Sequence, residues 1–147
     1  MKYPVARWIP AGCWMALIYG ASTDSGSVGH TRPVVTALLT RLFPEWVRRT
    51  EPTTLHAIDW SIRKCAHVTE YAILTLLVAF AIGRRTDSTR HLIWIVPLVY
   101  AITDEFHQSL VPSRYSSLLD VLVDMSGVAL VLFVFRVRFG SVFRFGF

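Results

Sequence analysis

The sequence predicts an all-α fold: a small polytopic membrane bundle of four transmembrane helices, with an amphipathic interfacial helix in the first outer loop. Hydrophobic residues make up 53% of the 147 residues, and only 17% are charged. Soluble domains typically carry about 25% charged residues. The apolar residues are gathered into runs about as long as a bilayer is thick. Helices satisfy every backbone hydrogen bond within one segment, so they are the expected form of such runs.

Four runs are long enough to cross a membrane, and we treat residues 1–147 as one domain. We expect the spans at about residues 5–21, 64–83, 92–111 and 118–135. At a rise of about 1.5 Å per residue these lengths cover roughly 25–30 Å, close to the thickness of the hydrocarbon core. The first span is marginal, because Pro10 and Gly12 interrupt it early.

The basic residues set the expected partners and the orientation. The net charge is +5, and the basic residues flank apolar runs. We therefore expect membrane lipids with anionic head groups as partners, and no nucleic acid. Four spans place both termini and the turn at 84–91 on one side, which is rich in basic residues: Lys2, Arg7, Arg84, Arg85, Arg90, Arg136, Arg138 and Arg144. Basic flanks face the cytoplasm, so both termini are predicted to be cytoplasmic in a multi-pass plasma-membrane protein.

The outer loop at residues 22–63 is too long for a plain linker. Its middle, from Val34 to Val47, repeats apolar residues with helical periodicity and places polar residues on the opposite face. This pattern predicts an amphipathic helix. Two positions fit it equally well: on the outer membrane interface, or as a lid over the bundle.

Three polar pairs, each with a spacing of four residues, interrupt the apolar runs. They are His67 with Tyr71, Asp104 with Gln108, and Asp120 with Asp124. This spacing puts each pair on one helix face. An Asp at the centre of a span costs about 2.5–3.5 kcal/mol, so such residues usually have a partner or a function. In the predicted orientation all three pairs fall in the outer half of the bundle, which indicates one outward-facing polar pocket.

Two segments resemble VanZ-like membrane proteins, a family named after a bacterial teicoplanin-resistance protein. They are RKCAHVTEYAIL (63–74) and DEFHQSLVPSRYSSLLDVLVDMSG (104–127), and YGAS (19–22) is a weaker match. The resemblance implies a bacterial plasma-membrane protein connected with the cell envelope and with glycopeptide tolerance. Asp124 stands where many members have Asn, which implies a hydrogen-bonding role. The characteristic residues carried over are Lys64, His67, Tyr71, Asp104, Glu105, Gln108, Arg114, Asp120, Asp124 and Gly127.

Two functional hypotheses follow, and the sequence leaves open whether the protein is an enzyme. In the first, the pocket binds a lipid head group or a lipid-linked cell-wall intermediate, with binding residues Lys64, Tyr71, Glu105, Gln108, Arg114 and Asp124. In the second, the protein is a membrane-embedded hydrolase or transferase acting on a lipid-linked substrate. Its catalytic residues would be His67, Asp104 and Asp120, because crowded carboxylates split their pKa values into an acid and a base.

Three further interpretations are weaker. His67, Asp104, Asp120 and Asp124 offer hard ligands for a divalent metal, but their spacing is not diagnostic, and we expect no cofactor. Transport is disfavoured, because the inner halves of the spans lack the polar residues of a pathway. The polar pairs could also simply hold helices together; Tyr71, Gln108 and Gly127 suit that role best.

Overall fold

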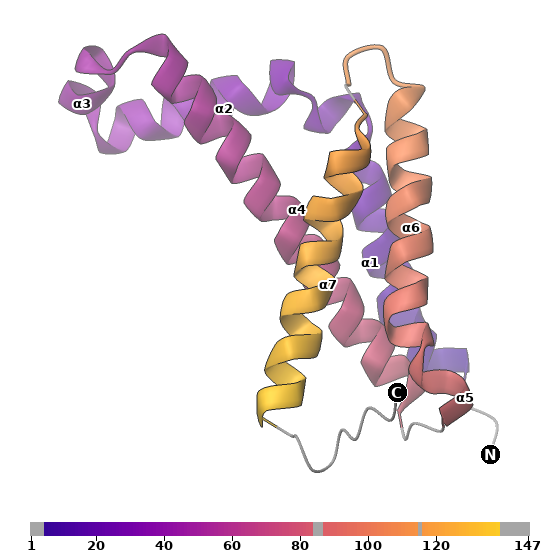
Figure 1. Cartoon of the computed structure of the whole chain (residues 1–147). Coiled ribbons are helices and arrows are strands. Elements are labelled where there is room, and N and C mark those ends of the chain that lie inside the picture. Colours follow the sequence, from indigo (N-terminus) through magenta and orange to yellow (C-terminus); the bar gives the residue numbers. More distant parts are fainter. Residues whose placement is uncertain (1–4, 84–86, 115, 139–147) are drawn as a thin grey trace.

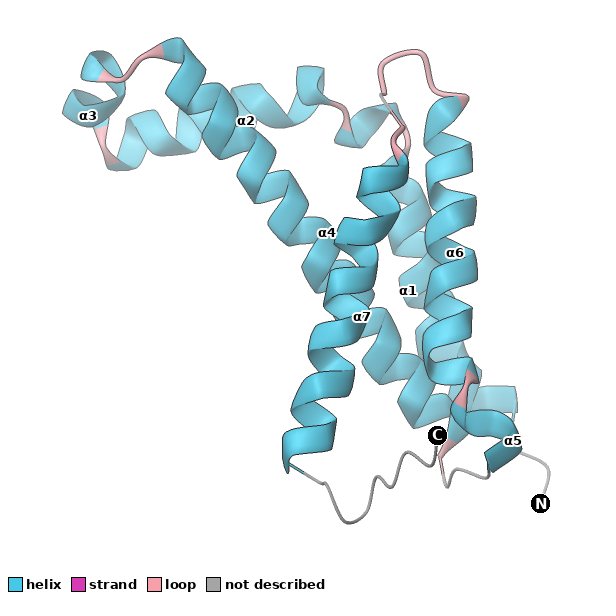
Figure 2. Cartoon of the chain, in the orientation of Figure 1, coloured by secondary structure: helices cyan, strands magenta, loops and turns pink. Residues whose placement is uncertain are grey.

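The computed structural model describes residues 5–83, 87–114 and 116–138. All regular structure in these ranges is helical, so the all-α class is confirmed (Figure 2). Lys2, Arg84, Arg85 and Arg144, used above to predict orientation, lie outside the described residues. The elements in chain order are η1 (Val5–Trp8), α1 (Ile9–Ser22), η2 (Asp24–Gly26), α2 (Val28–Leu42), α3 (Pro44–Arg49), α4 (Pro52–Ile82), α5 (Asp87–Arg90), α6 (Leu92–Ser109) and α7 (Leu118–Arg138).

Four helices form the bundle: α1, the C-terminal half of α4, α6 and α7 (Figure 1). The contact between α4 and α7 is the most extensive, and α6 packs on both. Tyr71, Leu74 and Val78 of α4 are fully buried, and Ala101 of α6 and Val128 of α7 belong to the same core. In water, burying each such side chain stabilises the fold by about 1.5–3 kcal/mol. Between helices in lipid this hydrophobic contribution is absent, and close van der Waals packing holds the helices together instead.

Two helices are long and apolar enough to cross a membrane: α4 and the segment Leu118–Arg136 of α7. Large apolar side chains such as Leu76, Phe80 and Phe133 point outward from the bundle, as expected of a surface that faces lipid. That α1 and α6 also cross the membrane remains a prediction. The 14 residues of α1 are few for a span, and the polar last turns of α6, which include Asp104, Glu105 and Gln108, lower its mean hydropathy.

The outer loop differs from its prediction. The expected helix at 34–47 is two helices, α2 and α3, because Phe43 leaves the helical region (φ −139°) directly before Pro44. A residue that precedes proline is pushed out of the α conformation. In addition, α4 begins at Pro52 and not near residue 64, and its 31 residues span about 46 Å. Its first turns therefore extend beyond the bundle.

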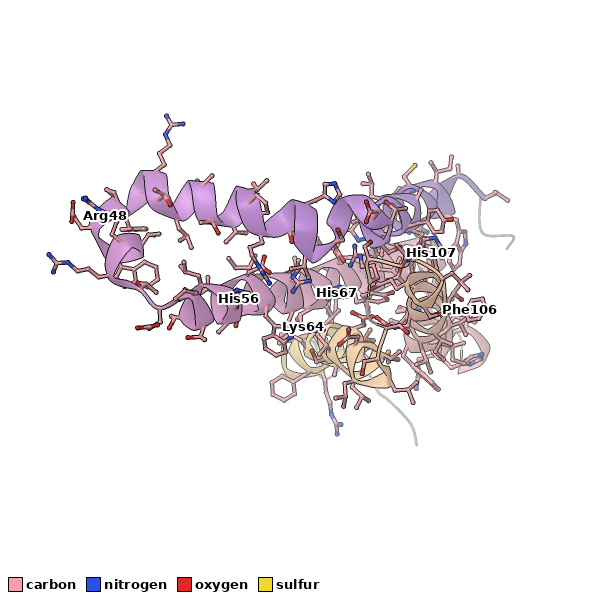
Figure 3. The ribbon with its side chains drawn as sticks, turned by 90° about the horizontal axis from the view of Figure 1, so that it is seen from above. Arg48, His56, Lys64, His67, Phe106 and His107 are labelled. Carbon is pink, nitrogen blue, oxygen red and sulfur yellow. The ribbon has the colours of Figure 1, made fainter. Side chains whose placement is uncertain are left out.

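Residues 28–63 form a projecting unit, which we call the arm. Helix α2 lies alongside the N-terminal half of α4, and α3 joins them at the far end (Figures 1 and 3). Figure 3 places Lys64 and His67 where the arm meets the bundle. The arm projects sideways and does not cap the bundle. A position of α2 on the membrane interface stays a prediction.

Asp59, which the sequence reasoning did not select, connects the two sides of the arm. Its side chain is 1% exposed. Thr31 Oγ1 lies 3.5 Å from Asp59 Oδ1, and Arg32 Nε lies 4.0 Å from Asp59 Oδ2. Arg63, one turn further along α4, places Nη2 at 3.4 Å. The i,i+4 spacing of Asp59 and Arg63 was the available sequence signal.

We predict that Asp59→Ala loosens the arm by about 1–2 kcal/mol. The substitution leaves Arg32 and Arg63 without their shared carboxylate, and their partial exposure reduces the cost below that of a fully buried pair. Hydrogen exchange of the α2 amides should accelerate about tenfold. Glu45→Ala is the control, because Glu45 pairs with Arg48 on an exposed surface of α3. Unchanged exchange in Asp59→Ala would show that other contacts hold the arm.

Candidate functional site

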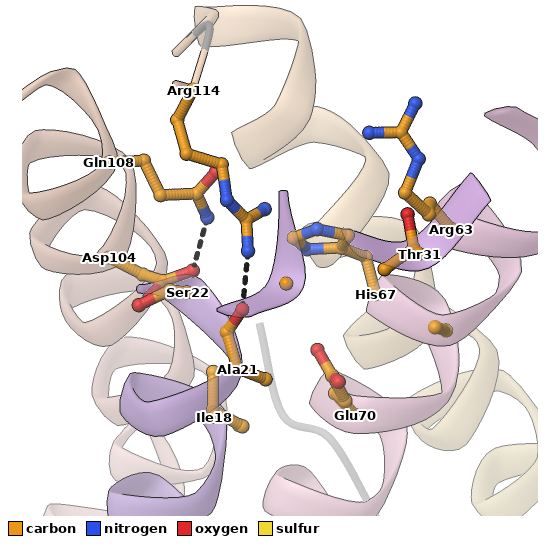
Figure 4. Close-up of a pocket in the computed structure, with 12 residues that line it drawn as sticks. Ile18, Ala21, Ser22, Thr31, Arg63, His67, Glu70, Asp104, Gln108 and Arg114 are labelled. Carbon is orange, nitrogen blue, oxygen red and sulfur yellow. Dashed lines mark hydrogen bonds between the residues drawn. The ribbon is translucent and has the colours of Figure 1, made fainter. Parts of the chain in front are cut away.

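A polar cavity of about 130 Å³ lies where the base of the arm meets α1, α6 and the loop before α7 (Figure 4). It brings together four residues predicted from the sequence: His67, Asp104, Gln108 and Arg114. We call this cavity the polar pocket. It is lined by Ile18, Ala21 and Ser22 of α1, Gly26 of η2, Thr31 of α2, Arg63, Ala66, His67 and Glu70 of α4, Asp104 and Gln108 of α6, and Arg114.

Asp104 and Gln108 form one wall of the pocket from successive turns of α6. Gln108 Nε2 donates a hydrogen bond of 2.9 Å to Asp104 Oδ2, as the i,i+4 spacing predicts. Asp104 is only 3% exposed, and its Oδ1 has no hydrogen-bond partner among the described residues. Leaving a buried carboxylate oxygen without a donor costs free energy. Asp104 Oδ1 is therefore available to accept a hydrogen bond from a ligand.

His67 faces the pocket from α4 and is held from behind by Asp124 of α7. The Nδ1–H of His67 donates to Asp124 Oδ1 at 3.0 Å, and Asp124 is fully buried. This bond leaves Nε2 as the free ring nitrogen on a residue that lines the pocket. A carboxylate behind an imidazole fixes its tautomer and orientation, so His67 is positioned to accept a proton or a hydrogen bond.

Asp120 belongs to a neighbouring part of the site. It forms an ion pair with Lys64 of α4, whose Nζ also lies 5.7 Å from the Trp60 ring centroid. A second cavity of about 300 Å³ is lined by Trp60, Lys64, Asp120 and other residues, and it shares Arg63, His67, Gln108 and Arg114 with the polar pocket. The predicted pair of Asp120 and Asp124 is thus divided between two partners on α4.

Arg114 closes the pocket at the loop before α7. Its side chain donates to the backbone oxygens of Ala21 and Thr23 at the end of α1. A cation suits the negative end of a helix dipole. Burial lowers the pKa of Arg114 below its usual value, but a guanidinium stays charged in proteins. Within the described ranges Arg114 pairs with no carboxylate.

A family comparison covers the helices that form this site. The model of the VanZ/LLP1 family matches residues 7–140. The chain belongs to the VanZ/LLP1 family. The match spans all of the residues just described, and together with the two apolar helices it indicates a membrane-associated protein. Searches among curated proteins and among solved structures find no match.

Three other polar residues of this VanZ/LLP1 protein lie outside the polar pocket. Glu105, predicted as a binding residue, accepts a 2.9 Å hydrogen bond from the backbone N–H of Ser117, just before α7. Tyr71 lies in the bundle core, with its ring 6.4 Å from that of Tyr100. His107 Nδ1 lies 3.2 Å from Ser22 Oγ, and its ring contacts the Tyr19 ring at a tilt of 35°. The weaker YGAS match thus contacts the end of α6.

The metal hypothesis finds no support in the described part of the VanZ/LLP1 chain. No three His, Cys, Asp or Glu side chains there are grouped so that they could hold an ion. His67 and Asp124 pair with each other, whereas Asp120 turns to Lys64 and Asp104 to Gln108. Their four carboxylate and imidazole groups therefore do not converge on one point.

Glu70 is the pocket residue whose role sequence spacing did not indicate. It lies three residues after His67 on α4, and its carboxylate points into the pocket below the His67 ring (Figure 4). No side-chain hydrogen bond or ion pair satisfies it among the described residues. The pocket therefore contains two carboxylates with free oxygens, one free imidazole nitrogen and one unpaired guanidinium.

Proposed function

We propose that this VanZ/LLP1 protein is an integral plasma-membrane protein of the bacterial cell envelope that binds the head group of a lipid or of a lipid-linked cell-wall intermediate. The polar pocket would hold the head group. The family resemblance to teicoplanin resistance supports a contribution to glycopeptide tolerance, because such antibiotics act on the same envelope.

The observation that carries this proposal is an unsatisfied acceptor and a guanidinium without a carboxylate partner in the same pocket. Asp104 Oδ1 has no donor, and Arg114 has no carboxylate partner in the described part of the chain. Each unsatisfied buried group costs about 1–3 kcal/mol. A bound head group with both donors and acceptors would satisfy them together. Helix association alone would not need polar groups that face a cavity.

The proposed topology has four crossings and cytoplasmic termini. The arrangement in Figure 1 supports it: α1 begins and α7 ends at one end of the bundle, whereas the loop between α6 and α7 lies at the other. The polar pocket lies near that second end, beside Arg114 of this loop. With cytoplasmic termini the pocket would face the outer leaflet, where lipid-linked wall precursors are used.

We predict that Asp104→Asn removes glycopeptide tolerance without removing the protein. The substitution keeps the shape of the side chain but removes its charge, and it should weaken binding of a donor-bearing head group about tenfold or more. The measurement is teicoplanin susceptibility of cells that produce each variant, alongside the amount of protein in their membranes.

Glu45→Gln is the matched control, because Glu45 is an exposed acid on α3, far from the pocket. It should leave both tolerance and protein level unchanged. Full tolerance in cells producing Asp104→Asn at a normal level would refute the proposed function. Loss of the protein in this variant would mean that Asp104 is needed for the fold. Asp104→Glu, which keeps the charge but displaces it, would then be the test: loss of tolerance at a normal protein level would support the proposed function, and full tolerance would refute it.

The hydrogen bond between His67 and Asp124 favours one alternative, a membrane-embedded hydrolase or transferase. Asp124 holds the imidazole through Nδ1 and leaves Nε2 free on a residue that lines the pocket, as a general base requires. The alternative predicts chemical change in lipid-linked wall precursors incubated with the purified protein, and about a 100-fold or greater loss of that activity in His67→Ala. Recovery of intact precursors from the wild-type protein would leave binding as the function.

A further inference from the structure

We infer that the ligand is a phospholipid whose head group carries both a phosphate and a primary ammonium, and that it enters from the bilayer between α4 and α7. This inference rests on the proposed function and names its ligand class. It follows from three adjoining hollows: a largely apolar groove, a cavity lined by three cations and one acid, and a deeper pocket that contains two carboxylates without a cationic partner in the described part of the chain.

The three hollows share lining residues and therefore adjoin one another. The outermost is an open groove of about 530 Å³ between α4 and α7, lined by Trp60, Leu119, Leu122 and others. It shares Trp60, Lys64, Ser117 and Asp120 with the second cavity. That cavity in turn shares Arg63, His67, Gln108 and Arg114 with the polar pocket. Together they make one path from the bundle surface to Asp104.

The groove suits an acyl chain. Leu119 and Leu122 are 68% and 64% exposed on α7, which is one of the two helices apolar enough to cross a membrane. Val123 adds to the apolar lining. An acyl chain lying here would continue the surrounding lipid, and its polar end would meet the Lys64–Asp120 ion pair at the mouth of the second cavity.

The second cavity suits a phosphate. Arg63, Lys64 and Arg114 line it against a single acid, Asp120. Arg114 is the key residue, because its described contacts are to backbone oxygens and leave its charge unneutralised. Guanidinium groups bind phosphate through charge-assisted hydrogen bonds, so the phosphate would lie beside Arg114.

The polar pocket, one step deeper, suits an ammonium. Its two acids are Glu70 and Asp104, and the two arginines that it shares with the second cavity, Arg63 and Arg114, lie at the boundary between the two. Asp104 is 97% buried and has an unpartnered Oδ1, and the Glu70 carboxylate points into the same space (Figure 4). A primary ammonium has three donors, enough for both carboxylates and one more acceptor. Arginines at the shared boundary and unsatisfied carboxylates beyond it thus match a phosphate joined to an amine by a short spacer.

The test measures lipid binding to the purified full chain in detergent by native mass spectrometry. The probes are phosphatidylethanolamine, phosphatidylglycerol and the trimethylated phosphatidylcholine, which cannot donate hydrogen bonds through its cation. The wild-type protein should bind phosphatidylethanolamine about tenfold more tightly than either other lipid. Glu70→Gln should reduce its affinity for phosphatidylethanolamine to the level of phosphatidylglycerol and leave phosphatidylglycerol unaffected.

Leu122→Trp tests the path, because a larger side chain on an exposed position of α7 fills the groove without touching the pocket. This substitution should weaken the binding of phosphatidylethanolamine about tenfold and leave the affinity for soluble glycerophosphoethanolamine unchanged. Equal affinity of the wild type for lipid and soluble head group would refute the role of the groove. If Glu70→Gln does not fold, the comparison of the three lipids on the wild type still decides the role of the ammonium.

Failure here can be told apart from failure of the proposed function. Equal binding of all three lipids, unaffected by Glu70→Gln, would refute recognition of the ammonium. The proposal that the pocket binds a head group would still stand. Absence of binding by any of them, with tolerance still lost in Asp104→Asn, would refute this ligand class and keep the proposed function. Full tolerance in Asp104→Asn would refute the proposed function itself.

Discussion

Gly127→Ala is expected to lower the melting temperature of the purified protein by about 6–12 °C, corresponding to about 3 kcal/mol. Gly127 lies on α7 where this helix crosses α4. A Cβ atom there would overlap the backbone oxygen of Val68 and lie 3.1 Å from the backbone nitrogen of Ala72. Both neighbours are backbone atoms of a packed helix, so neither can turn aside. The helices must separate, and the distance between His67 and Asp124 grows with them.

Gly12→Ala is the control for this prediction. Gly12 lies on α1, where an added Cβ atom meets nothing within 4 Å, and alanine is the better helix former by about 1 kcal/mol. Its melting temperature should stay unchanged or rise slightly. A small effect of Gly127→Ala, similar to that of Gly12→Ala, would show that α4 and α7 do not pack as closely as described.

Residue spacing predicted which side chains share a helix face, and there the structure agrees. Asp104 and Gln108 are hydrogen-bonded neighbours, and Gly127 lies at a close helix crossing. Both inferences depend only on the period of one helix and on the size of a side chain. They hold whatever the neighbouring helix is, which explains why a single sequence was sufficient.

Partners on different helices could not be predicted in this way. A spacing of four placed Asp120 and Asp124 together, but they meet Lys64 and His67 one turn apart along α4. This pairing depends on how α7 lies against α4. Asp124 thus supports the imidazole, and Asp120 pairs with a lysine at the edge of the groove.

The extent of α4 was missed for a different reason. Residues 52–63 are polar enough to resemble a loop, and only the part after Lys64 has the composition of a span. The helix nevertheless begins at Pro52, a residue that suits the first helical position, and α2 covers this segment through Asp59. Tertiary packing made a helix where hydropathy predicted none.

The second large effect is expected at Asp124, where alanine and asparagine should behave differently. Asp124→Ala removes the fully buried acceptor of His67 Nδ1–H and leaves that group without its hydrogen-bond partner. We expect head-group binding to weaken about 100-fold, because losing one partner of a buried charged pair costs about 3–5 kcal/mol. Asp124→Asn keeps an oxygen in place to accept the same hydrogen bond, so affinity should change by less than about threefold.

The same pair of variants separates binding from catalysis. A binding site needs only a fixed imidazole, which the asparagine preserves. A general base needs the negative charge as well, because the charge stabilises the imidazolium that forms when His67 takes a proton. Catalysis would therefore be about 100-fold slower in Asp124→Asn at unchanged affinity. Glu45→Gln is the control, since it removes a charge of the same kind from the exposed surface of α3, away from the polar pocket. Equal loss of binding in the asparagine and alanine variants would contradict a purely hydrogen-bonding role for Asp124 and require its charge for the ligand itself.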